Sequence, residues 1–164
     1  MEAKNGMVAT TQPLAAMAGL RVLMQGGNAV AAAVATAAAL NVVEPMSTGI
    51  GGDAFALIWN AKNKKVAALN AGGRAPGSAS LDELRNQGLS AIPANSPYAI
   101  SVPGTVDGWH SILASHGTMP LSEVLKPAIE YAEQGFPVSQ VIANQWQGSA
   151  TKLANQPSGY EFLI

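Results

Sequence analysis

The fold class is decided by GIGGDAFALIW at residues 49–59, a glycine-rich turn that runs directly into a strand. Successive side chains of a strand point to opposite faces, so Phe55, Leu57 and Trp59 share one face. Alanine and isoleucine at positions 54, 56 and 58 make the other face apolar as well. A strand that is apolar on both faces is typical of the middle of a layered fold. The polar run at 60–65 predicts a turn, and residues 66–69 return as a second strand.

The sequence on both sides of this hairpin predicts mainly helices. One helix begins at Pro13, continues through apolar residues at helical spacing and ends before the two glycines at 26–27. Asn28 is a candidate N-cap for the next helix, Ala29–Val43, which is apolar on all sides and is therefore expected to be covered all round. Further helices are predicted at 81–86, 104–115, 127–134 and 139–153, and further strands at 6–10 and 98–102. Helices packed on a small sheet give an α+β fold.

Length and composition indicate one globular domain without an affinity for nucleic acid. The 164 residues are 48% hydrophobic and 12% charged, which excludes a disordered segment because such segments are rich in charge. Nine Lys and Arg against ten Asp and Glu leave a net charge of -1, so there is no basic excess to bind phosphates. The longest apolar run, Ala29–Val43, is shorter than the roughly 20 residues that span a bilayer. No apolar segment follows a basic start, so we expect no signal peptide and a cytoplasmic protein.

Metal and cofactor chemistry have little support in the sequence. The absence of cysteine excludes disulfides, thiolate catalysis and Cys-containing zinc sites. The two histidines, His110 and His116, lie six residues apart, whereas a metal-binding pair on a helix needs a spacing of four. We expect surface or capping roles for them, no metal and no cofactor. Glu130 and Glu133, near Lys126, indicate a solvated helix face. The residues alone show no catalytic constellation.

Two glycine-containing loops are the candidates for ligand binding. The turn at 49–52 lacks the spacing of a dinucleotide-binding loop and the Gly-Lys-Ser/Thr of a phosphate loop. It is either a tight structural turn or a turn whose backbone contacts a ligand. Arg74 lies in NAGGRAP at 70–76, directly after the second predicted strand. Its guanidinium either binds a substrate carboxylate in a fork, or bridges loop carbonyls or pairs with a nearby acid.

A series of stretches resembles the opening of the large subunit of γ-glutamyltranspeptidases. They follow the order of that family with similar gaps: GMVAT at 6–10, AGL at 18–20, GGNAV at 26–30, GIGGDAF at 49–55, RAP at 74–76, PGTV at 103–106 with Gly108, GTMPL at 117–121 and GFPV at 135–138. Together they cover nearly the whole chain.

The resemblance implies the αββα architecture of an N-terminal nucleophile hydrolase, in which residues 1–164 are a single partial domain. Such enzymes are made as precursors that cut themselves, so that a threonine becomes the first residue of a small subunit. Its hydroxyl attacks the acyl carbonyl, and its own amine serves as the base. That threonine lies downstream of the stretches quoted above, so the resemblance places no catalytic residue in this chain. Thr10 and Thr11 instead align with the opening strand of the family.

The resemblance also implies the partners and the substrate class. The partners are the remainder of the large subunit, the small subunit that carries the nucleophile, and a small-molecule acyl donor. The donor is a γ-glutamyl or related acyl amide, similar to glutathione. Members of the family are often secreted or periplasmic, and the cytoplasmic expectation departs from them.

One position departs from the γ-glutamyl enzymes. The resemblance aligns the arginine that binds their substrate α-carboxylate with Gly72, whereas this chain has an arginine at Arg74. The Gly-Arg-Ala-Pro version resembles a branch of cephalosporin or glutaryl acylase-like members. The resemblance therefore makes Arg74 the candidate substrate-binding residue and implies an acyl-transfer fold with an altered acyl preference.

Two hypotheses follow for the function of the chain. The first is a segment of a γ-glutamyltransferase or hydrolase-like enzyme that is inactive by itself. The second is a non-catalytic binding or scaffold protein on a truncated copy of the fold. A cleavage site of Thr-Thr type beyond residue 164 would distinguish them.

Overall fold

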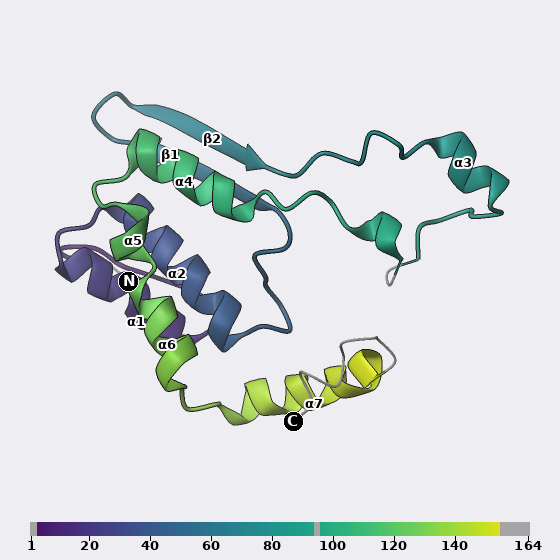
Figure 1. Ribbon diagram of the computed structural model, residues 1–164. Coiled ribbons are helices and arrows are strands. Elements are labelled where there is room, and N and C mark those ends of the chain that lie inside the picture. Colours follow the sequence, from purple (N-terminus) through teal and green to yellow (C-terminus); the bar gives the residue numbers. More distant parts are fainter. Residues whose placement is uncertain (1–2, 94–95, 155–164) are drawn as a thin grey trace. The chain divides into compact units, whose positions relative to one another are not determined.

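The computed structural model describes residues 3–93 and 96–154 (Figure 1). They form two compact units, one from the described residues up to Thr48 and from Ser122 onward, and the other from Gly49–Leu121. The first unit is helical, and the second contains a two-stranded sheet with a helix packed on it. This is the α+β composition that the sequence predicts. No helix in the described ranges is long and apolar enough to cross a membrane.

The first unit is built on two consecutive helices at the predicted positions, α1 (Pro13–Met24) and α2 (Ala29–Val43). Pro13 stands in the first turn of α1, where its missing N–H leaves no helical hydrogen bond unmade. The side chain of Asn28 accepts a hydrogen bond of 3.0 Å from a backbone N–H in the first turn of α2. The predicted cap is thus confirmed, and it satisfies one of the N–H groups that a helix start leaves open.

Small residues bring α1 and α2 close together. A Cβ at Gly19 of α1 would lie 2.2 Å from the hydroxyl oxygen of Thr36 in α2, so a larger residue requires the Thr36 side chain or the helix to move. Both helices bury alanines completely at this interface. In the described chain α2 is not covered all round as expected, because Ala33 is exposed. Within the described chain, α2 makes its main helix–helix contacts with α1 and α6 (Lys126–Gln134), which cover only part of its surface.

Side chains fasten α6 to α1. The Arg21 guanidinium of α1 pairs with both carboxylate oxygens of Glu130 in α6, and the second of these contacts measures 3.2 Å. The Tyr131 hydroxyl donates a hydrogen bond of 3.1 Å to the carbonyl of Leu14. The hydrogen bond from Arg21 holds the pKa of Glu130 below its ordinary value. Glu130 thus forms an ion pair while 41% of its side chain stays accessible, and Glu133 is exposed, as expected for a solvated helix face.

Two further helices complete the C-terminal part of the chain. The short α5 (Leu121–Val124) precedes α6, and α7 (Gln140–Ala154) follows it. The helix α7 corresponds to the predicted helix at 139–153. Ile142 of α7 is buried.

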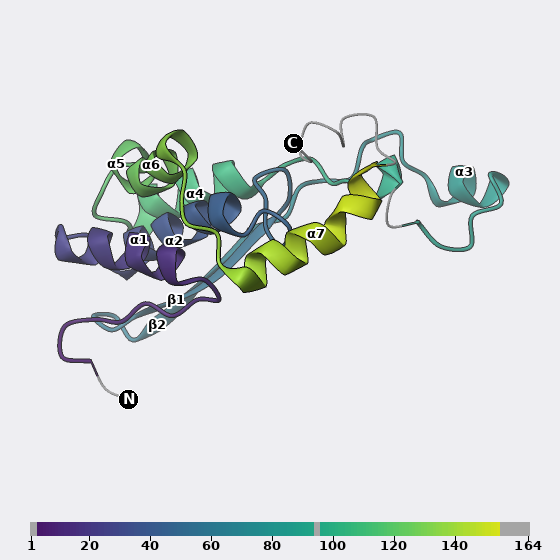
Figure 2. The ribbon, with the colours of Figure 1, turned by 90° about the horizontal axis from the view of Figure 1, so that it is seen from below.

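The second unit is built on an antiparallel hairpin of β1 (Ala54–Asn60) and β2 (Lys65–Ala71). The two strands run side by side over their whole length, as Figure 2 shows. The helix α4 (Thr105–His116) packs on one face of the hairpin, where Gly108 lies against Ala71. The absence of a side chain at position 108 is what allows the helix to lie directly on the strand.

The other face of the hairpin is apolar and exposed. It carries Phe55, Leu57 and Trp59, whose exposed fractions are 69%, 80% and 61%. The prediction of a strand covered on both faces is therefore wrong for the described chain, which covers one face only. Four such exposed side chains, including Val66 from β2, form a contiguous patch that we call the open hairpin face.

Two predicted strands are absent from the described chain. Residues 6–10 have no regular secondary structure, and a strand needs a neighbouring strand to satisfy its backbone groups. The predicted strand at 98–102 is replaced by a 3₁₀ turn, η1 (Pro97–Ala99), whose start is capped by the Ser96 side chain. The helix α3 (Leu81–Asn86), which precedes this segment in the sequence, forms as predicted. A short run of strand-forming residues was thus not sufficient where the described chain supplies no partner strand.

Candidate functional site

Three loop segments of the second unit meet beside the start of the hairpin. They are the glycine-rich turn that ends at Asp53, the loop at 72–76 after β2, and the segment at 101–105 that leads into α4. Arg74, the candidate substrate-binding residue, lies on the middle segment. The geometry of this junction determines where the Arg74 backbone is held.

Asp53 connects the other two segments. Its Oδ1 accepts a hydrogen bond of 3.1 Å from the Gly73 N–H and one of 2.8 Å from the Ser101 hydroxyl. The hydrogen bond from Gly73, followed by that from Ser101, lowers the pKa of the Asp53 carboxyl. Hydrogen bonds of this kind favour the charged form of a carboxyl group, so Asp53 is an ionised acceptor at neutral pH.

The residue before Asp53 makes a second set of connections. The carbonyl of Gly52 accepts hydrogen bonds from the N–H of Gly104 at 3.0 Å and the N–H of Thr105 at 3.1 Å. It also accepts one of 2.9 Å from the Thr105 hydroxyl. The turn at 49–53 therefore anchors the N-terminus of α4. In this way the turn has a structural role, one of the two alternatives that its sequence leaves open.

The glycines around Arg74 allow two backbones to touch. A Cβ at Gly73 would lie 1.5 Å from the Val102 carbonyl oxygen, and a Cβ at Gly104 would lie 2.3 Å from that of Ala71. Neither position accepts any side chain without backbone movement. The Val102 N–H also donates a hydrogen bond of 3.3 Å to the Arg74 carbonyl.

Arg74 itself is exposed. Among the described residues, its guanidinium takes part in no hydrogen bond or ion pair that would correspond to the structural alternative for this arginine. The backbone at Arg74 is held at two points. The N–H of the preceding Gly73 donates a hydrogen bond to Asp53, and the Arg74 carbonyl accepts one from the Val102 N–H. A fixed backbone with an uncommitted guanidinium is an arrangement that can bind a carboxylate.

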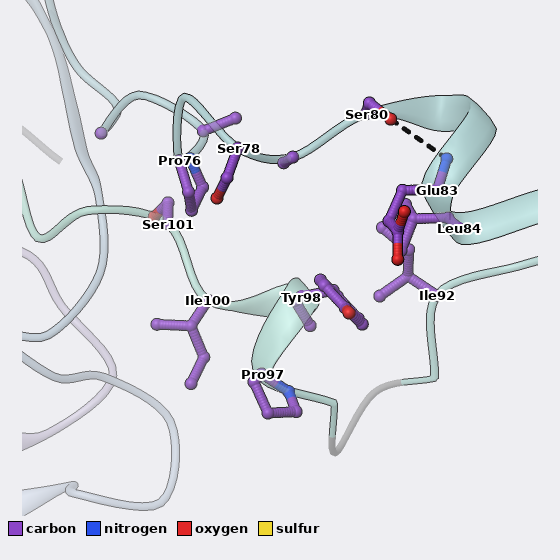
Figure 3. Close-up of a pocket in the computed structure, with 14 residues that line it drawn as sticks. Pro76, Ser78, Ser80, Glu83, Leu84, Ile92, Pro97, Tyr98, Ile100 and Ser101 are labelled. Carbon is purple, nitrogen blue, oxygen red and sulfur yellow. Dashed lines mark hydrogen bonds between the residues drawn. The ribbon is translucent and has the colours of Figure 1, made fainter. Parts of the chain in front are cut away.

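A pocket of about 730 Å³ lies next to this loop (Figure 3). Its lining comes from the loop after β2, from α3 and from the segment that ends at Ser101. Two residues of the lining, Gly73 and Ser101, are the ones that donate hydrogen bonds to Asp53. Apolar side chains mix with a few polar groups there: Leu84, Ile92 and Ile100 with Ser78, Ser80, Glu83 and Tyr98. This is a composition typical of small-molecule pockets.

The other candidate residues lie elsewhere and have simpler roles. His110 and His116 are both in α4, at its exposed side and its last turn. The Thr11 hydroxyl donates a hydrogen bond of 2.7 Å to the buried Glu44, and Thr10 is in the preceding irregular segment. In the described ranges, no group of three or more His, Cys, Asp or Glu residues could hold a metal ion.

Sequence reasoning singled out Arg74 but missed Asp53, Ser101 and Tyr98. The separations of 20 and 48 residues between Asp53 and its two donors hide their contact from any local pattern. A charged residue inside an otherwise glycine-rich turn was the one available signal.

Comparison with known proteins adds the family. The model of a family described as gamma-glutamyltranspeptidase matches residues 15–164. The glutathione hydrolase proenzyme of Bacillus subtilis (strain 168) is 39% identical over 164 residues, which cover 98% of this chain and 28% of the relative. The chain therefore spans a little more than a quarter of the length of that relative.

Two solved structures are similar throughout the chain. The gamma-glutamyltranspeptidase of Helicobacter pylori matches with a TM-score of 0.87 and 37% identity, over 97% of this chain and 46% of that one. The cephalosporin acylase of Bacillus halodurans matches with a TM-score of 0.87 and 46% identity, over 93% of this chain and 28% of that one. These matches confirm the predicted fold class, a part of an N-terminal nucleophile hydrolase.

Proposed function

The chain belongs to the gamma-glutamyltranspeptidase family, and from this premise we propose that it is part of an enzyme that cleaves acyl amides. The observation that carries the proposal is the family match over residues 15–164. This range includes the turn at 49–53, the Arg74 loop at 72–76 and the segment at 101–105. The proposed nucleophile is the N-terminal threonine of a small subunit outside this chain. The proposed partners are that subunit, the rest of the large subunit and a small-molecule acyl donor.

The proposed reaction proceeds in two steps. The threonine hydroxyl loses its proton to the threonine amine, and its oxygen forms an ester with the acyl carbon. The carbon–nitrogen bond of the donor breaks, and the amine leaves with the proton. Water or an acceptor amine then attacks the ester and releases the acyl group, which regenerates the hydroxyl. This chain contributes binding to these steps and no reacting group.

We infer that Arg74 binds a carboxylate of the acyl group. Arg74 has an exposed guanidinium, and its neighbours Gly73 and Ala75 line a pocket large enough for a small molecule, which supports this role. A shift of two residues along a loop moves a side chain by several ångströms, on the order of 3.3 Å per residue. We therefore expect the α-carboxylate of a γ-glutamyl group to be bound poorly, and a dicarboxylic acyl group such as glutaryl to be bound as well or better.

The experiment uses the complete protein that carries this chain. Hydrolysis of γ-glutamyl, glutaryl and uncharged butyryl anilides is measured for the wild type and for Arg74→Lys, which keeps the charge but loses the two-pronged geometry. We expect KM for the preferred carboxylate donor to rise about tenfold, with self-cleavage intact. Arg85→Lys, an exposed arginine of α3, is the matched control. An unchanged kcat/KM for every carboxylate donor would leave Arg74 a structural loop residue.

The chain by itself is expected to be inactive, since it lacks the nucleophile that supplies most of the rate. Purified chain of verified mass should show no hydrolysis of any of the three anilides. Turnover that survives replacement of Thr10 and Thr11 together would reject the proposed location of the nucleophile. A cytoplasmic location also remains a prediction, which cell fractionation tests.

A further inference from the structure

The loop that carries Arg74 is held at two neighbouring backbone groups. Asp53 accepts the Gly73 N–H directly before Arg74, and Val102 donates to the Arg74 carbonyl. These contacts leave the side chain of Arg74 as the part of the residue that can still move. Any group that sets the Gly73 peptide also sets the point from which the guanidinium reaches out.

A carboxylate that holds this loop could instead form an ion pair with Arg74, the residue after Gly73. In the described part of the chain Asp53 forms no ion pair with Arg74. Its Oδ1 instead accepts the Gly73 N–H and the Ser101 hydroxyl. The negative charge is thereby committed to the backbone of the loop, and the guanidinium keeps its donors for a ligand.

The same carboxylate also joins two residues of the pocket wall. Gly73 and Ser101 lie 28 positions apart in the sequence, and both line the pocket of about 730 Å³. Asp53 joins them through one oxygen atom. Loss of this acceptor would remove the hydrogen bonds that join these two parts of the pocket wall at Gly73 and Ser101.

We propose that Asp53 is a positioning residue for the acyl donor: it holds the Arg74 loop and the adjoining pocket wall in the arrangement that binds the donor carboxylate. This rests on the proposed function for its substrate, and on the observed hydrogen bonds for its geometry. Asp53 acts through Gly73 and Ser101 and does not itself touch the donor.

The test measures kcat and KM of the complete protein with a glutaryl anilide and with an uncharged butyryl anilide. For Asp53→Ala we expect KM for the glutaryl donor to rise about tenfold, because the Arg74 loop loses an ionised acceptor and such charge-assisted hydrogen bonds are stronger than neutral ones. We expect kcat, self-cleavage and KM for the butyryl donor to stay within about twofold. Asp53→Asn keeps an oxygen acceptor and should restore most of the loss. Asp107→Ala, an exposed carboxylate of α4, is the matched control.

A double-mutant cycle asks whether Asp53 acts through Arg74. In an Arg74→Ala background, Asp53→Ala should raise KM for the glutaryl donor no further. Equal increases of KM for the charged and uncharged donors, or additive effects in the cycle, would overturn the proposal and leave Asp53 a general structural residue.

A measurement that does not depend on turnover keeps the two proposals separate. Hydrogen exchange of the peptide that contains Gly73 should accelerate in Asp53→Ala and much less in Asp53→Asn, since the protecting acceptor is lost in the first. Unchanged exchange would overturn the positioning role whatever the activity. Accelerated exchange in a protein that cleaves none of the donors would instead reject the proposed function and, with it, the donor-binding part of this proposal.

Discussion

Gly108 of α4 lies so close to Ala71 of β2 that a Cβ at position 108 would be 2.4 Å from the Cβ of Ala71. Carbon atoms do not approach to this distance, so the helix lies directly on the strand only because residue 108 is glycine. The Gly52 carbonyl accepts hydrogen bonds from the first residues of α4, so the helix cannot shift along the strand without breaking them.

Gly108→Ala is therefore expected to destabilise the protein by about 1–3 kcal/mol, the usual effect of overpacking a close contact. The measurement is the urea midpoint of unfolding. Gly148→Ala is the matched control, because Gly148 stands in helix α7 with no atom near its absent Cβ. There the same substitution should be neutral or stabilising by up to about 1 kcal/mol. Equal effects of the two substitutions would contradict the packing of α4 on the hairpin.

The two sides of α2 should respond differently to a larger side chain. Ala35 is fully buried, whereas Ala33 on the same helix is exposed. Ala35→Leu is expected to cost about 1–3 kcal/mol, and Ala33→Leu should change the urea midpoint little. A large loss of stability from Ala33→Leu, measured in the complete protein, would mean that this side of α2 is also covered there.

The open hairpin face is expected to behave as an interface. An apolar patch of this kind favours association, so Leu57→Lys should reduce the self-association of the 164-residue chain in sedimentation experiments. Because the αββα architecture has two packed sheets, the same variant should lower the Tm of the complete protein. Leu81→Lys, at an exposed position of α3, is the control for both measurements. A complete protein that tolerates Leu57→Lys without loss of Tm would show that nothing packs on this face.

The ion pair between Arg21 and Glu130 should make stability depend on pH in the acid range. Because the folded-state pKa of Glu130 is lowered, the pair stabilises the protein above the ordinary carboxyl pKa. That contribution is lost as the pH falls through the lower, folded-state value. Glu130→Gln should thus lower the urea midpoint at about pH 7 and have a smaller effect at about pH 3. Glu133→Gln, on the same helix, should have little effect at either pH, and an equal effect of both variants would contradict the assignment.

The helices could be predicted because short local sequence signals mark where they begin and end. Pro13, Asn28 and the glycine pair at 26–27 act within one turn of the residues they limit, and α1 and α2 form where these signals place them. The strands at 6–10 and 98–102 failed because a strand is stabilised by a partner that local sequence does not specify. The hairpin succeeded because its partner is only a turn away.

The site was predictable to a smaller extent. Arg74 stood out through its glycine neighbours, and the structure explains Gly73 by its contact with the Val102 backbone. Asp53 and Ser101 gave no comparable signal, since their contact closes a loop of 48 residues. Pairings of Arg21 with Glu130 and of Thr11 with Glu44 were hidden for the same reason.

The location of the nucleophile is tested most directly by intact-mass spectrometry of the complete protein, quenched in acid shortly after mixing with a glutaryl anilide. The expected result is two polypeptides from self-cleavage, with the mass of a glutaryl group added to the fragment that begins with threonine and none added to the fragment that contains Arg74. A glutaryl adduct on the fragment that contains residues 1–164, or turnover by an uncleaved chain, would contradict the account.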